Sequence, residues 1–171
     1  MILVIGGSAS GKSEYAERLV LKLPGPHVYL ATMAADDAES RERVSKHREA
    51  RKHSDFRTVE RAAGLEGADI REGDIVLLEC LSNLAANEMF PADGPVRSEE
   101  ETEERLVREV LSLKDRAEEL VIVGNRLTGG GTDYEGLTDA WLRAFSAAQN
   151  RIAAEADEVW RVTGGIPERL K

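Results

Sequence analysis

The stretch GGSASGKS at residues 6–13 decides the fold of this chain, because it satisfies the pattern G-x-x-x-x-G-K-[ST]. It follows an apolar run at residues 1–5, expected as a buried strand, and opens an amphipathic segment at residues 11–23, expected as a helix. Glycines let successive N–H groups turn toward an anion, and the helix N-terminus adds the positive end of its dipole. A glycine-rich turn that matches by chance is the alternative, and the flanking elements weigh against it. The stretch therefore predicts a phosphate-binding loop, with Lys12 on the terminal phosphates and Ser13 on Mg²⁺.

The rest of the chain alternates between short apolar runs and longer amphipathic segments. Strands are expected at residues 1–5, 27–31, 75–78, 121–123 and 159–162, and helices at 11–23, 36–52, 81–90, 98–117 and 137–156. The segment 57–73 is interpreted as looser. Ser98 with Glu101 forms a capping box, as does Asp36 with Glu39. Strands apolar on both faces and separated by helices predict an α/β protein with a three-layer, P-loop NTPase-like (RecA-like) fold, its mostly parallel sheet covered on both faces.

The composition is that of a globular protein with well-mixed charges. Of 171 residues, 42% are hydrophobic and 32% charged, and 23 basic against 32 acidic side chains give a net charge of −9. A surface of that sign repels nucleic-acid backbones, so we expect no nucleic-acid partner. The single cysteine, Cys80, excludes an internal disulfide, and no run approaches the roughly 18 apolar residues that span a bilayer. We therefore expect one cytoplasmic domain over residues 1–171, without membrane insertion.

A Mg²⁺ ion at the phosphate loop also needs a carboxylate. Glu79 ends an apolar strand, at the sheet edge where ligand-binding groups gather in open α/β sheets. Asp69 and Asp74 lie at the other end of that strand and are poorer candidates. Because a glutamate at a strand end is equally often an exposed edge residue, both interpretations of Glu79 stay open.

A histidine lies within the most basic segment of this acidic chain. On a helix, Arg43, His47 and Arg51 would share one face at spacings i, i+4 and i+8. A neutral imidazole is a good nucleophile toward phosphorus, and flanking guanidiniums lower its pKa and stabilise phosphate oxygens. The spacing alone favours a solvated basic face that carries an incidental histidine.

Further segments show a resemblance to a known family. They are YLAT at residues 29–32, His47 and Arg51 as H-x-x-x-R, RTVE at 57–60, LLECLSNLAANEMF at 77–90, Gly124-Asn125, QNRIAAEADEVW at 149–160 and GIPERLK at 165–171. In this order, and together with the phosphate loop, they resemble the bifunctional adenosylcobinamide kinase / adenosylcobinamide-phosphate guanylyltransferase family. The resemblance covers residues 2–171. The phosphate loop alone is shared by many unrelated enzymes, whereas the ordered set is far more specific.

The resemblance implies a two-step chemistry. Using Lys12, Ser13 and Mg²⁺, the enzyme would move a phosphoryl group from ATP or GTP to the aminopropanol hydroxyl of adenosylcobinamide. His47 would then attack the α-phosphate of GTP, and the GMP-histidine would pass GMP to adenosylcobinamide phosphate. The resemblance also implies a homo-oligomer, typically a trimer. The expected catalytic residues are His47 and Lys12, and Ser13 and Glu79 are the expected metal ligands. The expected nucleotide-binding residues are Gly6, Gly7, Ser8, Ala9, Ser10, Gly11, Lys12, Ser13, Thr32, Arg48, Arg51 and Glu60.

Two positions depart from the family pattern. Ala9 replaces the arginine that the family's loop usually carries, so one phosphate contact is absent or supplied elsewhere. Arg126 replaces a glutamate after Asn125, which reverses a charge beside the expected site. Two alternatives therefore stay open, a monofunctional P-loop kinase of small molecules and a nucleotide-binding protein without catalysis.

Overall fold

The computed structural model describes residues 1–34, 55–127 and 136–171. Its strands are β1 (Ile2–Gly6), β2 (His27–Ala31), β3 (Phe56–Glu60), β4 (Ile75–Glu79), β5 (Glu119–Asn125), β6 (Glu158–Thr163) and β7 (Ile166–Arg169). Its helices are α1 (Lys12–Val20), the 3₁₀ turn η1 (Leu65–Gly67), α3 (Leu81–Met89), α4 (Glu99–Arg116) and α5 (Leu137–Glu155). The expected strands and helices that fall on described residues are confirmed, with ends shifted by a few residues.

The sheet has seven strands in the order β3-β2-β4-β5-β1-β6-β7. Every neighbouring pair runs parallel except β6 and β7. The carboxyl ends of β4, β5, β1 and β6 therefore meet at one edge, where the phosphate loop follows β1. The mostly parallel sheet predicted from the sequence is confirmed.

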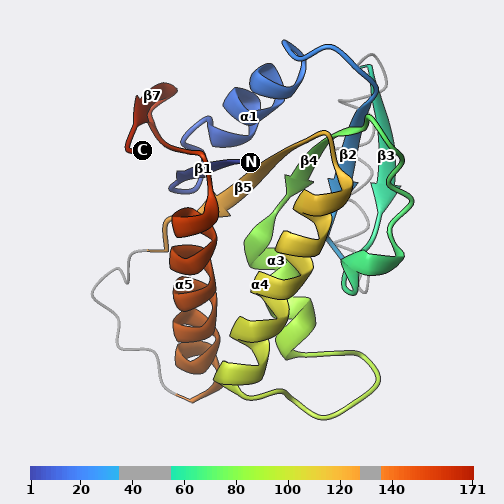
Figure 1. Cartoon of the computed structure of the whole chain (residues 1–171). Helices are drawn as coiled ribbons and strands as arrows, with labels where there is room; N and C mark the ends of the chain where they lie inside the picture. The colour runs from blue at the N-terminus through green and yellow to red at the C-terminus, as the bar shows by residue number, and fades with distance from the viewer. Residues whose placement is uncertain (35–54, 128–135) are drawn as a thin grey trace.

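Helices cover both faces of this sheet (Figure 1). On one face α3, α4 and α5 pack together over a core that includes Leu106, Ile122 and Phe145. On the other face α1 packs over β4, β5 and β1, with Ala16 and Val20 in a second core. Because the strands are buried from both sides, their apolar runs are continuous rather than alternating.

Helix α4 begins and packs as its sequence predicts. Ser98 Oγ accepts the backbone N–H of Glu101, and the Glu101 carboxylate accepts the N–H of Ser98, which completes the capping box. Leu106, Val110 and Leu113, spaced three or four residues apart, are fully buried and form an apolar stripe along the helix. Turning this stripe inward positions α4 against α5 and α3.

The interpretation of residues 57–73 as a looser stretch is wrong for its first part. Residues 56–60 form β3, an edge strand that pairs in parallel with β2, and residues 65–67 form η1. Arg57 on this strand donates to the buried carboxylate of Asp74 at 2.5 Å. The strand is half-exposed and carries charge, so it lacks the apolar run that marks its neighbours.

The C-terminal strand β7 was also missed by the sequence interpretation. It forms an antiparallel hairpin with β6 across Gly164 and Gly165, whose φ values of 57° and 80° suit a tight two-residue turn. Glycine adopts such angles without strain. The Gly-Gly pair between two extended segments was the available signal, but the proline and charges of β7 obscured it.

The hairpin returns the chain to helix α1. The Trp160 ring lies 5.5 Å from the Tyr15 ring between centroids, and the Arg169 guanidinium carbon lies 5.9 Å from the centroid of the Trp160 ring. The Trp160 indole N–H donates to Glu158 at 2.7 Å. Residues of β6, β7 and the first turn of α1 therefore share one aromatic cluster.

Candidate functional site

The phosphate loop lies between β1 and α1 and is held by the β6–β7 turn. The backbone N–H of Gly165 donates to the carbonyl of Ser10 at 2.8 Å. Gly11 has a φ of 85°, and a Cβ there would lie 3.2 Å from the Cα of Gly165. Lys12 Nζ donates to the carbonyl of Gly7 at 3.1 Å, so the ammonium group folds back across the loop. The predicted loop therefore adopts the strand–loop–helix context that the motif requires.

The structure brings Ser13 and Glu79 together across the sheet edge. Ser13 Oγ donates to Glu79 Oε1 at 2.9 Å, although the two residues are 66 positions apart in the chain. Ser13 is the second residue of α1, and Glu79 ends β4, two strands away from β1. A hydroxyl and a carboxylate oxygen in contact form a pair of hard oxygen donors.

Thr32, which directly follows β2, supports the end of β4. Its buried hydroxyl accepts the N–H of Cys80 and donates to the Glu79 and Cys80 carbonyls, at 2.8–3.1 Å. Asn87 on α3 donates to the carbonyls of Thr32 and Ala62. The structure therefore places the Thr32 side chain on backbone that holds Glu79, and Asn87 is a supporting residue that the sequence interpretation missed.

Glu60 lies on the edge strand β3, apart from the phosphate loop. Four strand intervals separate β3 from β1, which at about 4.8 Å each is about 19 Å. Its register partner is Ala31 on β2, next to Thr32. At the other end of β4, Asp74 accepts hydrogen bonds from Arg57 and from the N–H of Arg71, so its carboxylate fixes that end of the sheet.

A cavity of about 430 Å³ opens beside the first half of the phosphate loop. It is lined by Gly6, Gly7, Ser8, Ala9, Ser10, Arg126, Arg161, Val162, Thr163 and Gly164. Asn125 ends β5 in register with Gly6 and donates to Ser82 Oγ at 2.5 Å. Arg161 was missed by the sequence interpretation, although a strand parallel to β1 must end beside the loop.

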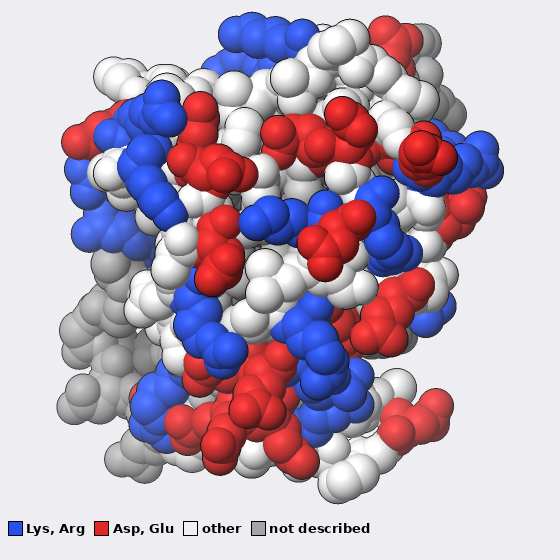
Figure 2. All heavy atoms as spheres, viewed as in Figure 1, with Lys and Arg blue, Asp and Glu red and all other residues white. Residues whose placement is uncertain are grey.

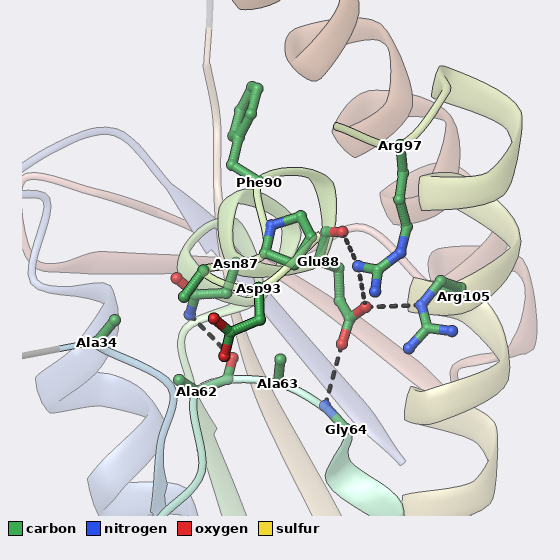
Figure 3. A pocket seen from close by; sticks show the side chains of 12 residues that line it. Ala34, Ala62, Ala63, Gly64, Asn87, Glu88, Phe90, Asp93, Arg97 and Arg105 are labelled. Carbon is green, nitrogen blue, oxygen red and sulfur yellow. Dashed lines mark hydrogen bonds and ion pairs between the residues drawn. The ribbon is translucent and has the colours of Figure 1, made fainter. Parts of the chain in front are cut away.

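A second cavity, of about 410 Å³, lies beyond the ends of β2 and β3 (Figure 3). Glu88 on α3 points into a cluster with Arg97, Arg105 and the backbone N–H of Gly64, as the dashed lines of Figure 3 show. Burial alone would raise the pKa of Glu88, but the hydrogen bond from Arg105 holds that pKa below its usual value. Glu109 on α4 accepts the N–H of Leu65, and burial beside Glu88 raises its pKa to about 7.

Three of the predicted site residues, His47, Arg48 and Arg51, lie outside the described residues, as does the expected helix at 36–52. Within residues 1–34, 55–127 and 136–171, no group of three or more His, Cys, Asp or Glu gathers as a metal site. In the same ranges no helix is long and apolar enough to cross a membrane. The face seen in Figure 2 carries acidic and basic side chains interspersed over α4 and α5.

The fold and the site are compatible with one class of protein, the P-loop nucleotide-binding proteins. The features that agree with this class are the mostly parallel sheet, the loop after β1 and the Ser13–Glu79 pair. The sequence model of the family described as cobinamide kinase / cobinamide phosphate guanyltransferase matches residues 2–170. The chain belongs to this family of enzymes.

Curated relatives agree with this assignment over nearly their full lengths. The chain is 32% identical to the bifunctional adenosylcobalamin biosynthesis protein CobU of Escherichia coli (strain K12), over 100% of this chain and 99% of the relative. It is 31% identical to the protein of the same name from Salmonella typhimurium (strain LT2), with the same coverage. The bifunctional adenosylcobalamin biosynthesis protein CobP of Pseudomonas aeruginosa is 28% identical, over 99% of this chain and 96% of the relative. The family resemblance seen in the sequence is confirmed.

Proposed function

We propose that this chain phosphorylates adenosylcobinamide with ATP or GTP and then transfers GMP from GTP to the adenosylcobinamide phosphate, through a GMP-histidine on His47. The observation that carries the proposal is the contact between Ser13 and Glu79 at the mouth of the phosphate loop, 2.9 Å between oxygens. It joins the loop to the end of β4, where open α/β sheets bind their ligands. The family membership supplies the acceptor and the second step.

In the kinase step the loop positions the triphosphate. The N–H groups at the start of α1 face the phosphate oxygens, and Lys12 leaves the Gly7 carbonyl to contact the β- and γ-phosphates. The acceptor hydroxyl oxygen forms a bond to the γ-phosphorus while the bond to the β–γ bridging oxygen breaks. The nucleoside diphosphate leaves, and the proton of the hydroxyl is released.

The residues present fit a Mg²⁺ ion. Ser13 Oγ and Glu79 Oε1 are two oxygen donors already in contact. Mg²⁺ is typically held by one or two protein oxygens, substrate phosphates and water, so a larger cluster of carboxylates is not required. Bound there, the ion would neutralise charge that develops on the phosphate oxygens. Thr32 keeps the β4 end, and with it Glu79, in place.

In the guanylyl step, an imidazole nitrogen of His47 forms a bond to the α-phosphorus of GTP and pyrophosphate leaves. A phosphate oxygen of adenosylcobinamide phosphate then displaces the histidine, which regains its lone pair. Basic residues Arg48 and Arg51 would stabilise the phosphate oxygens during both displacements. This role follows from the chemistry of guanidiniums that flank a nucleophilic histidine, and Arg51 also belongs to the H-x-x-x-R pattern of the family.

The covalent step is tested by incubating the purified protein with Mg²⁺ and GTP radiolabelled at the α-phosphate, followed by denaturation. We expect label retained by the unmodified chain, lost in His47→Ala and kept in the matched control His53→Ala. Label kept in His47→Ala, or absent from the unmodified chain, would contradict the assignment.

The kinase step is tested with GTP labelled at the γ-phosphate and adenosylcobinamide as acceptor. Lys12→Ala should lower kcat/KM by about a hundredfold or more, because it removes a cation from the transferring phosphate, whereas His47→Ala should leave this step intact. Kinase turnover without any histidine adduct would instead establish the monofunctional kinase. Nucleotide binding without turnover in either assay would leave the non-catalytic alternative.

We propose that the sheet has the RecA-like arrangement of P-loop proteins. The position of β1 between β5 and β6, with Glu79 two strands away on β4, supports the RecA-like arrangement. We propose that residues 1–171 act as one catalytic domain, which the family match over residues 2–170 supports. A homo-oligomer, a trimer by resemblance, completes the proposed assembly.

A further inference from the structure

The cavity beside the phosphate loop has a cationic wall. One side of this 430 Å³ space is the loop backbone at residues 6–10, and the other is formed by the ends of β5 and β6. Arg126 follows β5 and Arg161 lies within β6, and both residues line the space. The wall therefore faces the first half of the loop, beside the start of α1 where the phosphate oxygens are proposed to bind.

The loop itself carries little positive charge for the three or four negative charges of a nucleoside triphosphate. Lys12 is the only cationic side chain within residues 6–13. Ala9, which is exposed in the loop, contributes neither charge nor hydrogen bonds from its side chain. Glu14 and Glu79 add negative charge near the same end of α1. Lys12 and the Mg²⁺ ion proposed above do not neutralise all of this negative charge, so further cations would stabilise the phosphate chain. Guanidiniums match phosphate oxygens in geometry.

Arg126 is available for such a contact. Its backbone is fixed, because its N–H donates to the carbonyl of Gly6 at 2.9 Å. Its side chain is exposed, and no ion pair joins it to another residue in the part of the chain that the structure describes. Because the backbone of Arg126 is anchored and its guanidinium has no ion pair with any residue in the ranges 1–34, 55–127 and 136–171, the guanidinium can turn to an anion.

Arg161 is held in the wall by an exposed partner. It pairs with Glu168 on β7, with Nε at 3.0 Å from the carboxylate. Both side chains of this pair are substantially exposed to solvent, so the pair is weak and leaves other guanidinium N–H groups available. In the pairing of β6 with β1, Arg161 lies opposite Ile5, the residue directly before the loop.

We propose that Arg126 and Arg161 bind the polyphosphate chain of the nucleoside triphosphate from the β5–β6 side of the loop, replacing the cation that the loop lacks at Ala9. The inference rests on the nucleotide binding proposed above. Ala9 and Arg126, the two departures from the family pattern, are then linked. The positive charge missing from the loop at Ala9 is supplied by Arg126 on the other side of the cavity. The ligand group is the phosphate chain, not the base or ribose.

The test measures dissociation constants by equilibrium dialysis for GTP, GMP and inorganic pyrophosphate, at fixed Mg²⁺ and salt. Arg126→Gln and Arg161→Gln should each weaken GTP and pyrophosphate about tenfold and leave GMP unchanged, since each removes one charge-assisted contact to the chain. The double variant Ala9→Arg/Arg126→Gln should recover GTP affinity. Equal weakening of GTP and GMP, or no weakening of GTP, would overturn the proposal.

Matched controls separate this result from general effects of charge. Arg151→Gln removes another exposed arginine on α5, where it pairs with Glu103, and should leave all three constants unchanged. Glu168→Gln removes the partner of Arg161 but keeps the guanidinium, and should not weaken GTP. If the unmodified chain bound no GTP, the proposed function itself would fail. If GTP binding required Lys12 but neither arginine, the role of the two arginines would be disproved and the proposed function would still stand.

Discussion

Among single residues, the buried carboxylates Glu88 and Glu109 have opposite electrostatic surroundings. Glu88 accepts charged hydrogen bonds from Arg97 and Arg105 and is held ionised, whereas Glu109 faces Glu88 and has its pKa raised to about 7. Both accept backbone N–H groups of the turn at Gly64 and Leu65. The pair thus connects α3 and α4 to the segment after β3. Because the two carboxyl groups lie close together, one of them, Glu109, retains its proton to a higher pH.

This proton makes stability depend on pH. Between the ordinary glutamate pKa of about 4.5 and the raised value of about 7, folded Glu109 keeps a proton that the unfolded chain releases. The free energy of unfolding therefore falls as pH rises through this window, by ~1.4 kcal/mol per pH unit at most, and levels off above it. Glu109→Gln, which mimics the protonated acid, should flatten the slope in urea denaturation at pH 5 to about 8.

Glu109→Gln retains an oxygen for the N–H of Leu65, so it should fold, and Glu104→Gln on the exposed side of α4 serves as its control. The lowered pKa of Glu88 affects stability only below about pH 4.5, where it makes the free energy of unfolding rise with pH. It therefore does not contribute to the slope between pH 5 and about 8. An unchanged slope in Glu109→Gln would show that another group carries the pH dependence.

Among the elements, helix α4 depends on its first turn. Ser98 satisfies the N–H of Glu101, and three glutamates, Glu99, Glu100 and Glu101, lie at the positive end of the helix dipole. Ser98→Ala should lower the free energy of unfolding by about 1 kcal/mol, measured by urea denaturation, because the N–H loses its acceptor. Ser98→Asp restores an acceptor and should recover most of the loss. Equal stabilities for all three chains would argue that α4 is held by packing alone.

The elements also show what local sequence can predict. Strands β1, β4 and β5 are apolar on both faces, and α4 has a cap and a stripe, so each is visible in its own residues. Strand β3 is different, because its burial comes from β2 and from the Arg57–Asp74 pair, and its own sequence is charged. An edge strand of this kind is specified by its neighbours rather than by its own pattern.

On the scale of the whole molecule, the candidate site was partly predictable. The loop motif and the strand-end Glu79 are local signals, and parallel strands bring their carboxyl ends together. The Ser13–Glu79 contact confirms that these two residues lie together, while their binding of Mg²⁺ stays a prediction. The supporting roles of Thr32, Asn87 and Arg161 depend on strand order, which the sequence left undetermined.

The aromatic cluster at the C-terminal hairpin contains Trp160, whose fluorescence can report on changes near α1. Trp160 contacts Tyr15, which lies two residues beyond Ser13 in α1, while Trp141 stacks on Phe145 in α5. Nucleotide that reorders the start of α1 should therefore change the emission of Trp160. In Trp141→Phe the fluorescence change on adding Mg²⁺ and GTP should persist, and in Trp160→Phe it should vanish. The reverse pattern would place the responsive segment on α5. The two variants together would therefore identify which part of the structure changes when nucleotide binds.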